Sequence, residues 1–336
     1  MADLKVKYLG LELKNPIVAG ACNLTADVNN LKRMQDAGVA AIVFKSLFEE
    51  QIQLEALQME NHLSDMDHIH AEMTSLFPKI EHAGPADHLL QLSKAKKAVQ
   101  IPVIASLNAV LDDTWVEYAK KIEATGVDAL ELNFYSVTTD FNKTETDIIA
   151  HQIHVIKEVK NAVKIPVSVK LSSYYANVLN VVKQMEAAGA NGVVLFNRLF
   201  QPDIDIDKEA HHFPWNLSNN GDYRTSLRFA GLLHSHVKTS VITSTGVLSG
   251  SDAIQLLLAG ADAVQVVSTL YRNKIESIGK ILTEISEWMH TKGYNSVAEF
   301  QGKLSEAKTN DPFAYTRAQY VDILLNSQNI FEKFNA

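Results

Sequence analysis

The stretch SVITSTGVLSGSDAIQLLLAGADAVQVVSTLYRN, residues 240–273, determines how the whole chain is interpreted. A short apolar run leads through a glycine-containing turn into a helical pattern. A second apolar run then follows Gly260 and ends in Ser268 and Thr269. Both runs are continuously hydrophobic rather than alternating, which is typical of parallel strands covered on both faces. The stretch therefore predicts a strand, a crossover helix and a second strand parallel to the first.

The same unit recurs along the chain. A glycine and a small residue precede an apolar strand pattern at 37–46, 125–134, 188–197 and 260–269. Further apolar runs lie at 15–22, 101–108, 165–172 and 239–246, with helical patterns such as 115–124 and 177–188 between strands. Eight strand–helix units predict an α/β fold, a (β/α)8 TIM barrel. The alternative is an open doubly wound sheet, which is disfavoured because neither G-x-G-x-x-G after the first strand nor G-x-x-x-x-G-K-[ST] occurs.

The pattern predicts one domain over residues 1–336. Elaborated loops are expected at 47–100 and 198–239, and a helical segment at 285–336. In barrels, such additions usually lie over the carboxyl ends of the strands and cover the site.

Composition restricts the class of protein. The chain has 336 residues, 46% of them hydrophobic, and a formal net charge of -8. It can build a large core, and the lack of a basic block disfavours nucleic acid and anionic membranes as partners. The single cysteine, Cys22, excludes internal disulfides and cysteine-ligated clusters. Without a signal-peptide core or an apolar run of roughly 20 residues, we expect a soluble cytoplasmic protein that acts on a small molecule.

Polar residues stand where the predicted strands end, and barrel enzymes carry their chemistry there. They are Lys45, Ser46, Asn108, Asn133, Lys170, Asn197, Thr245, Ser268 and Thr269, with Gly246 beside them. Lys170 lies in the apolar segment PVSVKLSS, and burying a lysine is costly without a partner. It predicts either a structural ion pair or a cation that faces an electron-rich ring or a carboxylate. The asparagines offer amide groups for the edge of a heterocycle.

The loops at 244–250 and 267–269, after the seventh and eighth strands, predict a phosphate site. Backbone N–H groups of these loops bind phosphate in many barrels, and Gly246 and Gly250 permit close approach. The residues leave open whether the phosphate belongs to a substrate or to a cofactor.

Several segments, in the same order along the chain, resemble the FMN-dependent dihydroorotate dehydrogenases. They are NPIVAGA, FKS, SLN, ELN, VKLSSYY, FNR and the opening stretch from STGVLSG to VVSTLY. The segment KGYNSVAEFQGKLS, residues 292–305, resembles the closing helical segment of that family.

The resemblance implies an FMN at the barrel mouth. The residues at the cofactor positions are Gly20, Ala21, Lys45, Ser46, Asn108, Asn133, Lys170, Phe196, Thr245, Gly246, Ser268 and Thr269. The residues that would face the pyrimidine are Lys45, Asn133 and Asn197. Arg198, beside them, is expected either to clamp the carboxylate of a different substrate or to be solvated.

The resemblance also implies a reaction in which a base removes the C5 proton of dihydroorotate and the C6 hydride passes to flavin N5. Ser136 falls on the base position, and Lys45 is the second candidate catalytic residue. A hydroxyl is a poor base without a relay, for which Thr138, Thr139 and a water are candidates. The alternative for Ser136 is a loop hydroxyl without chemistry. A homodimer is implied; fumarate or a quinone could accept the electrons directly, whereas NAD would require a partner subunit.

Four features depart from the family pattern. The Gly-Leu-Pro-Asn substrate loop after the second strand is not found in residues 57–73, and Val137 and Thr138 replace the Pro-Asn after the base. In the phosphate loops, Thr245 and Val267 replace glycines, and a β-branched residue resists an unusual φ. Arg198 stands where a small hydroxyl residue is usual.

We therefore expect an FMN-dependent oxidoreductase that converts dihydroorotate to orotate in pyrimidine biosynthesis. The alternatives are an FMN barrel oxidoreductase acting on another cyclic amide or carboxylate, a flavin-free lyase or isomerase acting on a phosphorylated substrate, and a flavin-binding protein without turnover. The paired histidines at 68 and 70, 151 and 154, and 211 and 212 predict loop or surface histidines rather than a metal site, which needs three or four convergent ligands.

Overall fold

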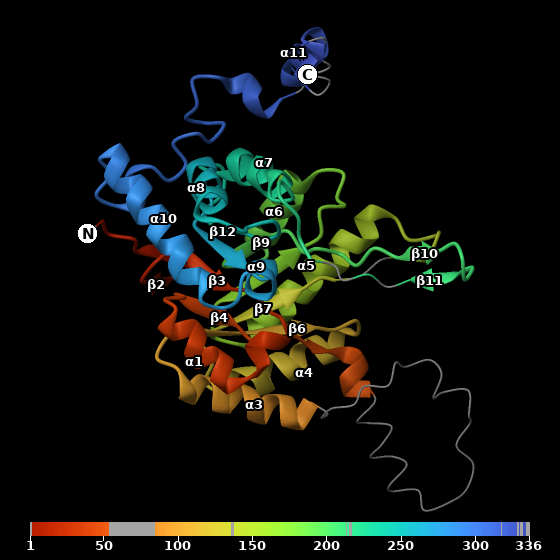
Figure 1. Cartoon of the computed structure of the whole chain (residues 1–336). Coiled ribbons are helices and arrows are strands. Elements are labelled where there is room, and N and C mark those ends of the chain that lie inside the picture. Colours follow the sequence, from red (N-terminus) through yellow and green to blue (C-terminus); the bar gives the residue numbers. More distant parts are fainter. Residues whose placement is uncertain are drawn as a thin grey trace, which may run out of the picture.

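A computed structural model describes residues 2–53, 85–135, 138–212, 214, 217–316, 318–327, 329 and 332–333. Within these residues, eight parallel strands form a closed barrel (Figure 1). The strands are β3 (Ile17–Ala19), β4 (Ala41–Val43), β6 (Val103–Asn108), β7 (Ala129–Asn133), β8 (Val167–Leu171), β9 (Gly192–Leu195), β12 (Ser240–Thr243) and β13 (Ala263–Val266). Pairing of β13 with β3 and of β4 with β6 closes the ring, so the barrel prediction is confirmed and the open sheet is excluded.

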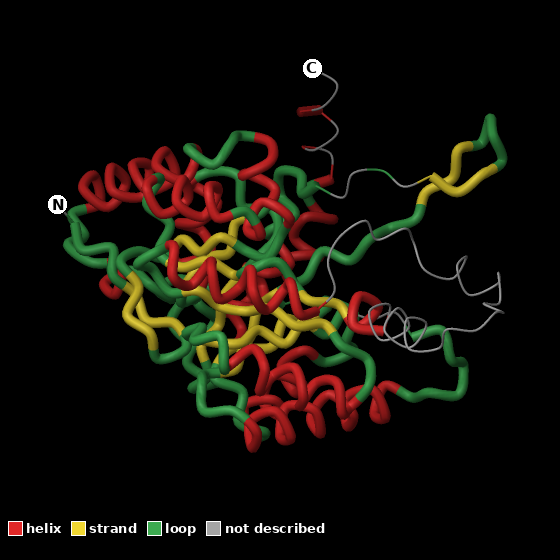
Figure 2. Tube along the Cα trace, turned by 90° about the horizontal axis from the view of Figure 1, so that it is seen from below, coloured by secondary structure: helices red, strands yellow, loops and turns green. Residues whose placement is uncertain are grey.

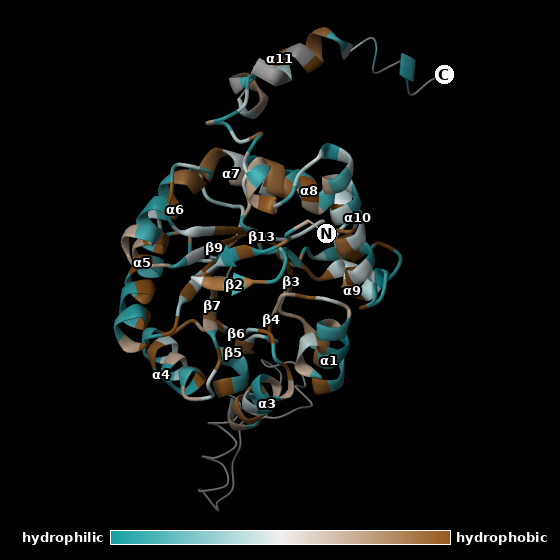
Figure 3. Ribbon diagram, turned by 90° about the vertical axis from the view of Figure 1, so that its left-hand side faces the viewer, coloured by the Kyte–Doolittle hydropathy of each residue, from teal (hydrophilic) through white to brown (hydrophobic). Residues whose placement is uncertain are grey.

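Helices alternate with the barrel strands, and Figure 3 shows helices surrounding the strands as a ring. They are α1 (Val28–Asp36), α3 (Pro85–Ala98), α4 (Asp112–Glu123), α5 (Glu145–Ala162), α6 (Val178–Ala187), α7 (Arg224–Leu233) and α8 (Gly250–Ala259). Capping boxes at Thr144 and Ser249 begin α5 and α8. Gly38, Gly126, Gly189 and Gly260, the glycines that precede four of the strand patterns, all have positive φ, which is common where a helix ends.

A short antiparallel hairpin covers the amino-terminal end of the barrel. It consists of β1 (Val6–Tyr8) and β2 (Leu11–Leu13), and Tyr8 is fully buried. The hairpin packs closely because a Cβ on Gly192, at the start of β9, would lie 2.5 Å from Cδ2 of Leu9. The backbone N–H of Leu9 also donates to Oγ of Ser240, at the start of β12. One end of the barrel is thus filled, and the cavities described below lie at the other.

The remaining elements extend the barrel. Strand β5 (Leu47–Phe48) adds to the end of β6, and the hairpin of β10 (Asp203–Asp205) and β11 (Ala210–His212) projects from the barrel (Figure 2). After β13 come α9 (Ser268–Arg272) and α10 (Ser277–Lys292), which packs on α8. Short 3-10 helices lie at Asn23–Ala26, Val297–Glu299 and Pro312–Tyr315. Helix α11 (Ala318–Leu325) stands away from the barrel in Figures 1 and 3.

Candidate active site

Three adjoining hollows lie at the carboxyl ends of the strands, and Asn197, just after β9, lines all of them. The central cavity, of about 230 Å³, is lined by Lys45, Ser46, Asn133, Tyr135 and Lys170, among others. The turn cavity, of about 190 Å³, lies over the loops after β12 and β13 and shares Ala21 and Lys170 with the central cavity. The side chamber, of about 350 Å³, shares Arg198 and Thr245 with the turn cavity.

A row of amides forms one wall of the central cavity. The Nδ2 of Asn197 donates to Oδ1 of Asn133 at 2.6 Å, and the Nδ2 of Asn108 donates to the carbonyl of Asn133 at 2.7 Å. Asn108 therefore orients the end of β7 and does not line any of the three hollows. Because the amides hold one another, Asn133 and Asn197 present donors and acceptors at fixed positions, which suits the edge of a planar heterocycle.

Lys170 lies between the central and turn cavities and is held from within the barrel. Its Nζ donates to Oε1 of Gln265 at 3.1 Å, and the Nε2 of Gln265 donates to Oε2 of Glu131 at 2.7 Å. The Lys170 ammonium is also 3.9 Å from Oε1 of Glu131, and these two side chains are 8% and 1% exposed. A buried charge requires such partners. The structural ion pair expected for Lys170 is present, and Lys170 also lines both cavities; that it faces an electron-rich ring or a carboxylate stays a prediction.

Sequence reasoning missed Glu131 and Gln265. Each is a single polar residue inside an apolar barrel strand, in ALELN of β7 and AVQV of β13. A polar side chain at such a position needs an interior partner, so this was an available signal. The chain's only cysteine, Cys22, also lines the central cavity, and burial raises the pKa of its thiol.

The turn after β12 has an unusual backbone. Thr245 and Gly246 both have positive φ, +72° and +80°, and Oγ1 of Thr245 donates to the carbonyl of Phe196 at 3.0 Å. A Cβ on Gly246 would collide with the backbone N of Tyr223. In the facing loop, Oγ of Ser268 accepts from the N–H of Ser218 at 2.8 Å. This turn lies after the seventh barrel strand, where barrels commonly bind phosphate.

Lys45 also lines the central cavity. Beside it, Oγ of Ser46 and Oγ of Ser106 form a hydrogen bond of 2.7 Å. Burial, with the charge of Lys45 as the second cause, lowers the pKa of His88 to about 4. His88 packs edge-on against Phe44 with ring centroids 5.4 Å apart. The histidine next to Lys45 is therefore neutral at pH 7, and Lys45 supplies the positive charge at this side.

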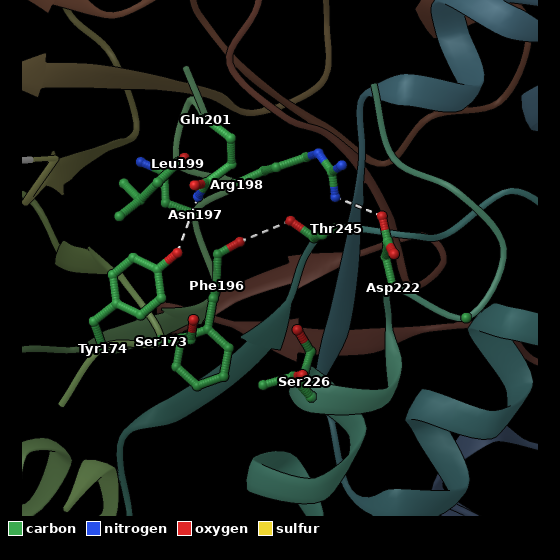
Figure 4. A pocket seen from close by; sticks show the side chains of 12 residues that line it. Ser173, Tyr174, Phe196, Asn197, Arg198, Leu199, Gln201, Asp222, Ser226 and Thr245 are labelled. Carbon is green, nitrogen blue, oxygen red and sulfur yellow. Dashed lines mark hydrogen bonds and ion pairs between the residues drawn. The ribbon is translucent and has the colours of Figure 1, made fainter. Parts of the chain in front are cut away.

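Arg198 crosses from the end of β9 toward the start of α7 (Figure 4). Its Nη1 contacts Oδ2 of Asp222 at 2.5 Å, and the same carboxylate oxygen accepts from the N–H of Asn219 at 2.8 Å. The side chains of the pair are 32% and 29% exposed. Arg198 therefore pairs with a carboxylate of its own chain, which neither sequence-based expectation for this residue included.

Comparison with known proteins identifies the family. The model of the dihydroorotate dehydrogenase family matches residues 80–289, more than half of the chain. The chain belongs to the dihydroorotate dehydrogenase family. The members to which it is similar are oxidoreductases that act on a CH–CH bond, and the chain is accordingly an enzyme of this class.

Curated relatives match nearly full length at low identity. The catalytic subunit of the NAD(+)-dependent dihydroorotate dehydrogenase B of Methanocaldococcus jannaschii is 26% identical over 300 residues, which cover 85% of this chain and 93% of the relative. The corresponding subunit of Thermoplasma volcanium is 26% identical over 306 residues, covering 90% and 98%. Dihydroorotate dehydrogenase A (fumarate) of Lactobacillus helveticus is 23% identical over 325 residues, covering 90% and 99%.

Most of the positions implied by the family resemblance come together. The residues that line a hollow are Ala21, Lys45, Ser46, Asn133, Lys170, Phe196, Asn197, Arg198, Thr245, Gly246 and Ser268. Gly20, Asn108 and Thr269 do not line one. Gly20 nevertheless allows a close approach, since a Cβ there would lie 2.7 Å from Cγ2 of Val267.

The proposed base, Ser136, its neighbour Val137, residues 57–73, and with them His68 and His70, lie outside the described residues. Thr138 and Thr139 line a further groove, against α4 and α5, that shares Tyr135 with the central cavity. Among the residues described, no group of three His, Cys, Asp or Glu side chains gathers as a metal site would require. None of the described helices has the length and apolar composition needed to cross a bilayer.

Proposed function

We propose that this chain binds FMN across the central and turn cavities and oxidises dihydroorotate to orotate. The observation that carries the proposal is the position of Lys170, which lines both cavities while Gln265 and Glu131 hold it from below. A fixed cation beside a row of amides complements the electron-rich edge of an isoalloxazine ring. When bound, the flavin would supply the acceptor for the hydride.

The chain's own residues fit the two ends of FMN. The Thr245–Gly246 turn supports phosphate binding, because it lines the turn cavity together with Ser268, in the loops after the last two strands where barrels commonly bind phosphate. Gly20 and Gly246 are required by the packing around this turn, because a Cβ on Gly20 would collide with Val267 and a Cβ on Gly246 would collide with Tyr223. Lys45, Asn133 and Asn197 are assigned to the pyrimidine: the ammonium pairs with its carboxylate, and the amides hold its ring edge and orient it.

Ser136 is assigned to the removal of the C5 proton, on the basis of the family resemblance. The change Ser136→Ala is expected to slow flavin reduction by dihydroorotate by about 100-fold or more, the usual contribution of a positioned base, without changing the flavin content. Stopped-flow absorbance under anaerobic conditions measures the rate, and Ser172→Ala in the next strand's loop serves as a control. Equal rates in the Ser136 variant and the wild type would remove Ser136 from the mechanism.

The proposal as a whole is tested by a visible spectrum followed by anaerobic addition of dihydroorotate. Flavin absorption that bleaches supports both cofactor and substrate. If the flavin absorption persists, the assignment of the cofactor stands and dihydroorotate is refuted as the substrate. If the protein does not bind added FMN, the central proposal is refuted. The homodimer and an electron-transfer partner remain predictions that gel filtration and co-purification can examine.

A further inference from the structure

The side chamber shares Phe196, Asn197 and Thr245 with the proposed site, but the rest of its lining has no role in the proposed function. Asn197 lines it together with the central cavity, so a group attached to a ring held by Asn133 and Asn197 can extend into it. The chamber's walls come from the loop after β8, the segment after β9 and the start of α7 (Figure 4). Its volume of about 350 Å³ is at the lower end of the range for small-molecule sites.

The lining of the side chamber is polar and electrically balanced. The charged side chains in its described lining are Arg198 and Asp222, which pair at 2.5 Å and cancel one another's charge. An anionic group entering here would meet the carboxylate of Asp222 as well as the guanidinium of Arg198. The chamber therefore does not favour a further anion.

The uncharged groups in the chamber both donate and accept hydrogen bonds. Hydroxyls come from Tyr174 and Thr225, and amides come from Asn197 and Gln201. The Nε2 of Gln201 donates to the hydroxyl of Tyr174 at 3.0 Å. Mixed donors and acceptors of this kind match alcohol groups, each of which has one O–H donor and two acceptor lone pairs.

We propose that the side chamber holds an uncharged, hydroxylated substituent of the substrate ring, of the size of a pentose. The preferred substrate would then be a reduced pyrimidine carrying a sugar rather than the bare ring. This inference rests on the proposed function, because the ring must lie on the amides of Asn133 and Asn197 for its substituent to reach the chamber.

The test compares orotate with orotidine, which carries ribose on the same ring, and with orotidine 5′-monophosphate. Each compound is titrated into the FMN-loaded protein, and binding is followed by calorimetry and by the change in flavin absorption. Two or more additional hydrogen bonds predict that orotidine binds about tenfold more tightly than orotate. Tighter or equal binding of orotate overturns the inference and leaves the proposed function intact.

Two variants localise the preference. Tyr174→Phe and Thr225→Val each remove one hydroxyl at nearly constant volume, so the ratio of orotidine to orotate affinity is expected to fall toward one. Tyr175→Phe is the matched control, because the Tyr175 hydroxyl bonds to Gln152 at 2.8 Å and does not line the chamber. An unchanged ratio in both chamber variants would refute the assignment. Binding of the monophosphate alone would show a site for an anion instead, and failure of all three compounds would refute the proposed function as well.

Discussion

The barrel interior and the rim of its mouth each contain an ion pair, and the two ion pairs differ in burial. Inside, Lys170 and Glu131 are 8% and 1% exposed, and Gln265 bridges them. At the rim, Arg198 and Asp222 are 32% and 29% exposed. A buried pair is fixed because either charge alone is very unfavourable there, whereas water can replace a partner at the rim. The interior pair is therefore expected to contribute more to stability than the rim pair.

Breaking the interior pair has the largest expected effect. Glu131→Ala leaves the Lys170 ammonium without its buried counter-charge, and we expect a loss of about 3–5 kcal/mol in the free energy of unfolding. Urea denaturation followed by circular dichroism measures it. The control is Glu12→Ala in the exposed Lys7–Glu12 pair, whose side chains are 77% and 65% exposed, and which should change stability by less than about 1 kcal/mol. Similar losses in both variants would contradict the distinction between buried and exposed pairs.

His88, the histidine beside Lys45, makes the stability of the folded protein depend on pH. Burial lowers the pKa of His88 to about 4 in the folded protein, below its unfolded value of about 6.5. Between these values the unfolded chain binds the proton and the folded chain does not. Stability is therefore retained above about pH 6.5 and falls as the pH is lowered toward 4, by about 3 kcal/mol for this group.

The contribution of His88 is isolated by comparing His88→Asn with the wild type in urea denaturation at several pH values. The comparison is needed because Asp262, whose pKa burial raises to about 6, acts in the opposite direction: its contribution is present at low pH and is lost as the pH rises toward 6. The difference between the two proteins is expected to shrink from pH 7 to pH 4. A difference that stays constant over this range would show that His88 titrates normally.

Breaking the rim pair has a smaller expected effect on stability. Arg198→Ala removes a partly exposed pair, for which we expect a loss of about 1 kcal/mol or less, decreasing further in 0.5 M salt. Urea denaturation at two salt concentrations checks this. Lys170→Ala, measured in parallel, supplies the interior counterpart and should show little dependence on salt. A loss at Arg198 as large as at Lys170 would remove the contrast between the regions.

The sequence predicted the barrel because each strand is a short, continuous apolar run, and that signal is local. It could not show which polar residue at a strand end faces a cavity. The strand β13 ends at Val266, and Ser268 and Thr269 begin the helix α9; Ser268 lines the turn cavity and the adjacent Thr269 does not. The partners of Lys170 and Arg198 were equally out of reach, since Gln265 and Glu131 are separated by 134 positions, and Asp222 lies within the loop predicted at 198–239.

An effect of similar size is expected at Thr245, which combines a strained backbone with a useful hydrogen bond. Its φ of +72° is unfavourable for a β-branched residue, but its Oγ1 donates to the carbonyl of Phe196. Thr245→Ala removes the bond and retains a Cβ in the left-handed region, so we expect a loss of about 1 kcal/mol. Thr245→Gly removes the bond and also relieves the backbone, which should bring the change close to zero. Thermal unfolding of the two variants without added flavin measures the difference. If the alanine variant were at least as stable as the glycine variant, the backbone of Thr245 would not be strained. The turn at the rim would then be no less favourable in backbone conformation than the strands of the barrel interior.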